Sequence, residues 1–144
     1  MSLPATTYPT ITRASVENLA LKRYVETVSH RSFQFAEPGV KSRFHRDSRM
    51  VLRILARKLV LPVGSYSIRS HMGELSEPGH ITLELANGSI QIFQSGLHKG
   101  VQIKIRRFDG LGHRLLVASL TSPVAALLDV DQLVERINPI LSLT

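Results

Sequence analysis

The sequence contains no cysteine and no tryptophan. It has five phenylalanines and three tyrosines. The absence of cysteine excludes disulfides, thiol nucleophiles and cysteine-based zinc sites, and nothing in it requires an oxidising compartment. The scarcity of aromatic rings argues against a function based on stacking of nucleic-acid bases.

Long apolar segments are absent as well. The longest apolar runs, LVLPV and LLVASL, are far shorter than the roughly 20 residues that a membrane-spanning helix needs. The N-terminal stretch MSLPATTYPTITR has no basic segment followed by an apolar one, so it does not resemble a secretory signal. The sequence therefore predicts a cytoplasmic protein that does not enter a membrane.

Acidic residues are scarce in one region of the chain. The whole sequence has 18 basic and 11 acidic residues, which gives a net charge of +7. Residues 41–58 contain seven of the basic residues and only one acid, Asp47, so this segment alone carries 7 − 1 = +6. The remaining residues are nearly balanced, with 11 basic and 10 acidic side chains. Charge concentrated in this way is typical of a surface that binds an acidic partner.

Helical periodicity appears twice in the first half of the chain. Residues 1–13 contain two prolines and no apolar period, and they predict a flexible arm ahead of a single domain formed by residues 14–144. In the stretch 15–30 apolar residues recur every three or four positions, with Ser15 available as the capping residue. A second helix is predicted from about Phe44 to Leu59, after a connector that Pro38-Gly39 interrupts.

Short runs of alternating apolar and polar residues follow the second predicted helix. Four runs, within residues 65–70, 80–86, 89–94 and 101–108, predict antiparallel strands with one buried face. Asn87-Gly88 is a strong two-residue hairpin signal, and it predicts that Leu85 lies opposite Ile90. The run RLLVASL is interpreted either as a last strand or as a buried segment leading into the C-terminal helices.

The C-terminal part of the sequence predicts one or two further helices. Ser122-Pro123 is a typical helix start, Asp129 or Asp131 can cap a further turn, and Asn138-Pro139 is expected to end the last helix. The predicted fold class is therefore α+β, with two N-terminal helices, an antiparallel meander of four or five strands, and one or two C-terminal helices. All helices are expected to cover the same apolar face of the sheet.

The basic residues of the second predicted helix form a stripe. When residues are placed at about 100° intervals, five arginines fall in one arc opposite the apolar face. We call them the arginine stripe: Arg43, Arg46, Arg49, Arg53 and Arg57. Lys104 and Arg106 on the outer face of the predicted sheet could extend the stripe, as could Arg69 on an edge strand.

Arginine suits phosphate because its planar guanidinium donates paired hydrogen bonds to phosphate oxygens. Five such contacts predict a salt slope of about −4 to −5 on duplex DNA. The connector between the two helices is longer than the turn of a helix-turn-helix motif, and the outer sheet face lacks the paired aromatics of an RNA-recognition sheet. The sequence therefore predicts nucleic-acid binding that is directed to the backbone and only weakly sequence-specific.

Two alternatives use the same residues. Long arginine side chains also shield amphipathic helices and keep proteins soluble, without any partner. An interaction or inhibitory module would use the arginines to dock on an acidic protein, and exposed sheet edges could pair with a partner strand or with a second copy of the chain.

Catalytic and metal-binding motifs are missing from the sequence. None of the six histidines has the spacing of a helical metal site, and no phosphate-binding loop or nucleophile motif is present. The densest group of potential ligands is His71, Glu74, Glu77 and His80, which is interpreted as a solvated loop. We predict a protein that is not an enzyme and that has no cofactor and no metal.

The segment from residue 52 to residue 83 resembles a family of small proteins encoded on bacterial plasmids and other mobile elements, a family with no assigned activity. The matching residues are Leu59, Leu61, Pro62, Gly64, Tyr66, Ile68, Arg69, Gly73, Gly79, Ile81, Thr82 and Leu83. The downstream Asp-Tyr-Thr-Gly-Gly stretch of that family is replaced here by FDGLGHRLL, so any role of that stretch is not carried over. The resemblance implies a bacterial, mobile-element context and no mechanism.

Overall fold

The computed structural model describes residues 12–29, 38–74, 77–94, 100–109 and 115–142. The elements in chain order are α1 (Arg13–Ser29), α2 (Pro38–Lys58), β1 (Tyr66–His71), β2 (His80–Leu85), β3 (Gly88–Gln94), β4 (Val101–Asp109), β5 (Leu115–Pro123), the 3₁₀-helix η1 (Val124–Asp129) and α3 (Val130–Leu141). Within these residues, no helix is both long enough and apolar enough to cross a membrane.

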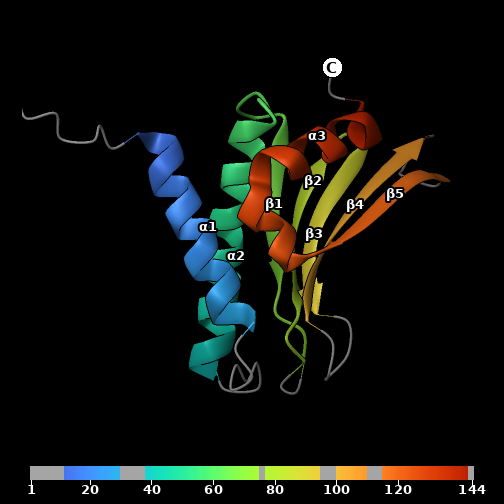
Figure 1. Cartoon of the computed structure of the whole chain (residues 1–144). Coiled ribbons are helices and arrows are strands. Elements are labelled where there is room, and N and C mark those ends of the chain that lie inside the picture. The colour runs from blue at the N-terminus through green and yellow to red at the C-terminus, as the bar shows by residue number, and fades with distance from the viewer. Residues whose placement is uncertain (1–11, 30–37, 75–76, 95–99, 110–114, 143–144) are drawn as a thin grey trace, which may run out of the picture.

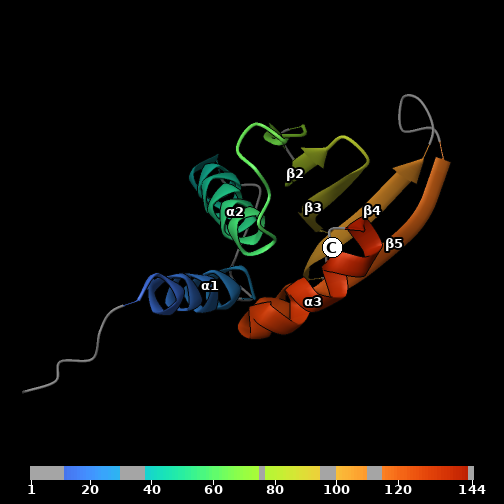
Figure 2. The same cartoon turned by 90° about the horizontal axis from the view of Figure 1, so that it is seen from above.

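The five strands form one antiparallel sheet in the order β1-β2-β3-β4-β5, and the helices lie on one side of it (Figures 1 and 2). Helices α2 and α3 contact the sheet directly, whereas α1 packs against α2 and η1. The α+β class and the meander are confirmed, and the fifth strand that the sequence left open is present. We call the face toward the helices the inner face and the opposite one the outer face.

The core lies between the inner face and the helices. Alternation along the three central strands places six aliphatic side chains there with no exposed surface: Ile81, Leu83, Ile90, Ile92, Ile103 and Ile105. The same alternation directs Gln102, Lys104 and Arg106 outward, as the pattern predicts.

Helix α1 starts earlier than the sequence pattern indicates. The backbone N–H of Ser15 donates to the Thr12 hydroxyl oxygen at 3.1 Å, so Thr12 is the capping residue and Ser15 lies in the first turn. Arg13 consequently belongs to the helix and not to the arm predicted for residues 1–13. Residues 1–11 lie outside the described part of the chain.

Helix α2 begins at Pro38 and not near Phe44, so the interpretation of Pro38-Gly39 as a break was wrong. Proline is well suited to the first helical position, because its ring presets φ and its missing N–H has no partner there anyway. The earlier start places Phe44, which is 1% exposed in the core, in the second turn of the helix.

The β2–β3 turn consists of Ala86 and Asn87, one residue before the predicted position. Leu83 pairs with Ile90 and Leu85 with Gly88, so the predicted pairing of Leu85 with Ile90 was wrong. A Cβ on Gly88 would lie 2.6 Å from the backbone oxygen of Arg106 on the neighbouring strand β4. Strands β3 and β4 therefore approach too closely there for any side chain at position 88. The shift is two residues, which leaves the same side chains on the buried face.

The C-terminal helices confirm one predicted cap and correct two boundaries. The Asp129 carboxylate accepts from the backbone N–H of Gln132 at 3.4 Å at the start of α3. A helix does begin after Ser122-Pro123, but it is the 3₁₀-helix η1, with Pro123 at its N-cap and no side-chain cap, and both residues end β5. Helix α3 continues through Pro139 to Leu141, because a proline in the last turn removes only one hydrogen bond while Leu141 is buried in the core.

Candidate nucleic-acid interface

The arginine stripe lies on the side of α2 that faces away from the core. The buried side of the helix carries Phe44, Val51, Leu52 and Leu55, and Leu59 follows directly after it; each of the five is at most 6% exposed. This burial holds α2 at a defined rotation, so the arginines on the opposite arc are directed away from the sheet or along its edge. The five stripe members nevertheless have different surroundings.

Arg43 and Arg46 are the most accessible members with a neighbouring acid. Their side chains are 60% and 75% exposed, and both approach the carboxylate of Asp47, at 3.6 Å and 3.4 Å. Exposed ion pairs of this kind contribute only about 0 to 1 kcal/mol, so one shared carboxylate does not commit either guanidinium. Both groups therefore remain available to an external anion.

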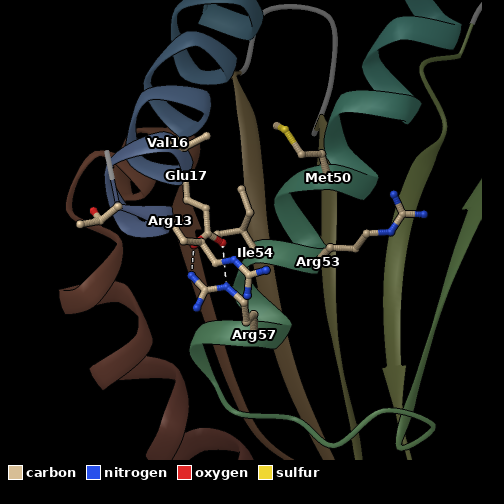
Figure 3. A pocket seen from close by; sticks show the side chains of 8 residues that line it. Arg13, Val16, Glu17, Met50, Arg53, Ile54 and Arg57 are labelled. Carbon is tan, nitrogen blue, oxygen red and sulfur yellow. Dashed lines mark hydrogen bonds and ion pairs between the residues drawn. The ribbon is translucent and has the colours of Figure 1, made fainter. Parts of the chain in front are cut away.

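Arg53 is exposed, and its side chain has no ion pair or hydrogen bond to another described residue. Figure 3 shows its guanidinium extending away from Glu17 and Arg57. It is thus the stripe member whose charge is least compensated by the described part of the protein.

Arg57 is already paired within the protein. Its Nε and Nη2 donate to the two carboxylate oxygens of Glu17 on α1, with the Nε contact at 3.0 Å, as the dashed lines in Figure 3 mark. The Glu17 side chain is only 12% exposed. This two-point ion pair connects α1 to α2, and it neutralises a group that the sequence assigned to phosphate binding.

Arg49 is bound to the edge of the sheet. Its Nη1 donates to the Ser70 hydroxyl at 3.0 Å and its Nη2 to the Ile68 backbone oxygen at 3.3 Å. Both partners belong to β1, the edge strand nearest α2. Arg49 therefore covers part of an otherwise unpaired strand edge, a role that sequence reasoning did not anticipate.

Two further basic residues of the segment 41–58 also have internal partners. Lys41 is 8% exposed, and its Nζ donates to the Glu74 backbone oxygen at 2.9 Å. Lys58 lies 3.4 Å from the carboxylate of Asp131 on α3. Of the seven basic residues that give this segment its charge, Lys41, Arg49, Arg57 and Lys58 are thus engaged within the molecule.

Arg13 adds a basic group that the sequence had placed in the arm. It lines an open groove between α1 and α2 (Figure 3), whose other lining residues are Thr12, Val16, Glu17, Met50, Arg53, Ile54 and Arg57. No sequence signal could reveal this neighbour of Arg53, because only the packing of α1 on α2 brings the two together.

The three predicted sheet residues lie on a different surface. Lys104 and Arg106 are half-buried on the outer face of β4. Arg69 is on the outer face of β1, 67% exposed and 3.5 Å from Glu84. The eight predicted site residues consequently divide into an accessible group on α2, an outer-face group on the sheet, and the internally bound Arg49 and Arg57.

His45 connects α2 to the segment between β1 and β2. It is 4% exposed, and its Nε2 donates to the Pro78 backbone oxygen at 2.8 Å, which leaves Nδ1 without a partner among the described residues. Burial lowers the pKa of His45, the charges of Lys41 and Arg49 lower it further, and the bond to Pro78 opposes the shift.

The pKa shift of His45 predicts an acid-sensitive fold. The unfolded chain takes up this proton near its usual pKa of about 6.5, before the folded chain does, so stability is complete above that pH and is lost as pH falls. Urea unfolding at about pH 7.5 and about pH 5.5 should show a lower free energy of unfolding at the acidic value. His45→Gln should reduce this difference. An identical pH dependence in the variant would contradict the assignment.

His80 contributes to the same acid sensitivity. Burial lowers its pKa, and His71, His45 and Arg106 add to the shift. Some pH dependence is therefore expected to remain in His45→Gln and to become smaller in a variant that also carries His80→Gln.

The histidines that the structure describes do not gather as metal ligands. In the part of the chain that the structure describes, no three His, Asp or Glu side chains lie close enough to hold a metal ion. The rings of His71 and His80 stack on each other, with centroids 4.6 Å apart. His30, His98 and His113, and the Asp109-Gly110 turn beyond Asp109, lie outside the described residues.

No protein-family model, curated protein or solved structure matches this chain. The similarity to plasmid-encoded proteins therefore stays a prediction from sequence.

Proposed function

We propose that the protein binds the phosphate backbone of nucleic acid through the exposed side of α2. The observation that supports this proposal is the group formed by Arg43, Arg46 and Arg53, in which the first two share the carboxylate of Asp47 and the third has no ion pair to a described residue. Arg13 lies across the groove from Arg53 and adds to the positive potential. Guanidinium groups in such a group attract and bind phosphate oxygens without reading bases.

The proposed contact is directed to the backbone and weakly sequence-specific. Its arginines lie along a helix that packs on the sheet by its other side, so they offer a flat row of donors to a phosphate strand. A bacterial plasmid or another mobile element, which the sequence resemblance suggests as the context, would provide both nucleic acid and cytoplasmic partners.

The salt dependence of binding tests this proposal. With three stripe arginines accessible, the logarithm of the association constant should fall with a slope of about −3 against the logarithm of salt, compared with −4 to −5 for all five. Between about 50 and 200 mM salt this corresponds to a loss of about 40- to 60-fold in affinity. Fluorescence anisotropy with two unrelated duplexes of equal length should give this slope for both. Absence of binding at low salt would contradict the proposal.

A protein-interaction module is the second candidate, and the free edge of β5 supports it. Among the described strands, this nine-residue strand pairs with β4 alone, and it has no charged side chain between Leu115 and Pro123. Leu115, Leu116 and Val117 are 61%, 51% and 44% exposed. An uncharged edge of this length can accept a strand from a partner or from a second copy. If the salt titration shows no binding and light scattering shows a dimer, this candidate is preferred.

A further inference from the structure

The outer face of the sheet carries three rings in one row. His71 on β1 pairs with His80 on β2, and His80 pairs with Phe93 on β3, so all three side chains project from the same face. We call His71, His80 and Phe93 the ring row. The His71 and His80 rings stack with centroids 4.6 Å apart and an angle of 30° between their planes. Two of the three rings are histidines, which the residue pattern of an RNA-recognition sheet does not include.

The ring row is open to solvent at the edge of the sheet. His71 lies on the edge strand and is exposed, while His80 and Phe93 are half-buried. The helices cover only the inner face, as Figures 1 and 2 show. Since His71 is exposed on the edge strand, part of its ring is accessible to a further planar ring.

Basic side chains lie beside the ring row on the same face. Arg69 precedes His71 by two residues on β1 and is 67% exposed. Lys104 occupies the matching position on β4, and Arg106 follows in the next row. The carboxylate within reach of Arg69 is Glu84, at 3.5 Å, and that carboxylate is itself 43% exposed. The face thus combines planar rings with cations.

We propose that the outer face binds single-stranded nucleic acid, with bases stacked on the ring row and phosphates bound by Arg69 and Lys104. This inference rests on the proposed function, since it takes nucleic acid as the ligand and specifies its strandedness. A duplex hides its bases in its own stack, whereas a single strand can turn them toward protein rings. Rings combined with cations are the arrangement that such a strand requires.

The pairing of the β-strands indicates how a single nucleic-acid strand would run across the outer face. Arg69 and Lys104 are three strand spacings apart, or about 14 Å, with Thr82 and Gln91 between them in the same row. Gln91 Nε2 donates to the Thr82 hydroxyl at 3.5 Å, so the surface between the two cations is polar. A single strand running across the sheet from β1 to β4 would place its phosphates along this row and its bases along the neighbouring ring row.

The test uses a labelled mixed-sequence 12-mer as single-stranded DNA, as single-stranded RNA and as duplex DNA. The intact chain should bind the single strands, and His71→Ala should weaken that binding at least about 5-fold while changing duplex affinity less than 2-fold. His71→Tyr keeps a ring and should restore binding. Ser67→Ala, an exposed change on the same strand and face, is the matched control and should have no effect.

A 12-mer without bases separates stacking from charge. This base-free strand should bind the intact chain and His71→Ala equally weakly, because it offers no base that could stack on the ring row. Phe93→Leu provides a second ring variant, with its thermal unfolding measured to verify that it folds. Equal single-strand affinity for the intact chain, His71→Ala and Phe93→Leu would overturn the inference, as would full affinity for the base-free strand.

The outcomes distinguish this inference from the function on which it rests. Duplex binding that is lost when Arg46 and Arg53 are reversed, together with single-strand binding that ignores the rings, overturns only the inference. Absence of any binding at low salt overturns both. If DNA and RNA single strands bind equally, the ring row and the cations account for recognition, whereas a preference for one identifies the strand that the face binds.

Discussion

Replacing Gly79 by alanine should lower the free energy of unfolding by about 2 to 5 kcal/mol, the sum of a left-handed backbone penalty and an overlap penalty. Gly79 has φ +72°, a conformation that side chains disfavour. A Cβ there would also lie 2.0 Å from the backbone oxygen of His71 and 2.7 Å from the carbonyl carbon of Met72. Because both are backbone atoms, no side-chain rotation can relieve the overlap, and the start of β2 must move.

Two further glycines make this prediction specific. Gly64 has φ +88° but open space around it, so Gly64→Ala should cost only the backbone penalty of about 1 to 2 kcal/mol. Gly39 lies in the first turn of α2 with no neighbour within 4 Å, and Gly39→Ala should stabilise the protein by up to about 1 kcal/mol. Urea unfolding of the three variants should give this order. A Gly79→Ala protein as stable as Gly64→Ala would show that β2 tolerates the shift.

Reversing Arg46 and Arg53 together to glutamate should weaken duplex binding about 100-fold or more. Each charge-assisted hydrogen bond contributes about 1.5 to 3 kcal/mol, which is at least about 10-fold in affinity for each arginine. Both side chains are exposed, and neither has a buried partner, so the double variant should unfold at nearly the same temperature as the intact chain. The slope of the logarithm of the association constant against the logarithm of salt concentration should become shallower by about 2.

A charge-matched control separates position from total charge. Both the double reversal and a second variant, Lys22→Glu with Arg136→Glu, change the net charge from +7 to 7 − 4 = +3. Lys22 and Arg136 are exposed on α1 and α3, outside the stripe and the outer face. If the control loses as much affinity as the stripe variant, attraction is a property of the whole molecule and the proposed site is wrong.

The arginine stripe illustrates how far residue spacing can predict a site. Periodicity placed the arginines opposite the apolar side of α2, and the burial of that side agrees with it. Spacing could not reveal that Glu17, 40 residues away in the chain, binds Arg57, or that Ile68 and Ser70 bind Arg49. Such partners depend on how helices and strands pack, which a pattern within one helix does not contain.

The ring row illustrates the reverse situation. The small number of aromatic residues argues against stacking, although alternation in SIQIFQ directs Phe93 away from the core. Its proximity to two histidines follows from pairing between three strands. A count of residue types cannot detect a group that the register assembles from distant positions.

By itself, the sequence determined the α+β class, the order of the two N-terminal helices and the first four strands, the buried face of those strands and the arginine arc of α2. These properties follow from local periodicity, because side chains project every 3.6 residues around a helix and alternate across a strand. Only the tertiary structure decided the β2–β3 register, the start of α2 at Pro38, the capture of Arg49 and Arg57, and the assembly of the ring row. Those features depend on which surfaces come within a few ångströms of each other, and distance in space is not encoded by the pattern of any single segment.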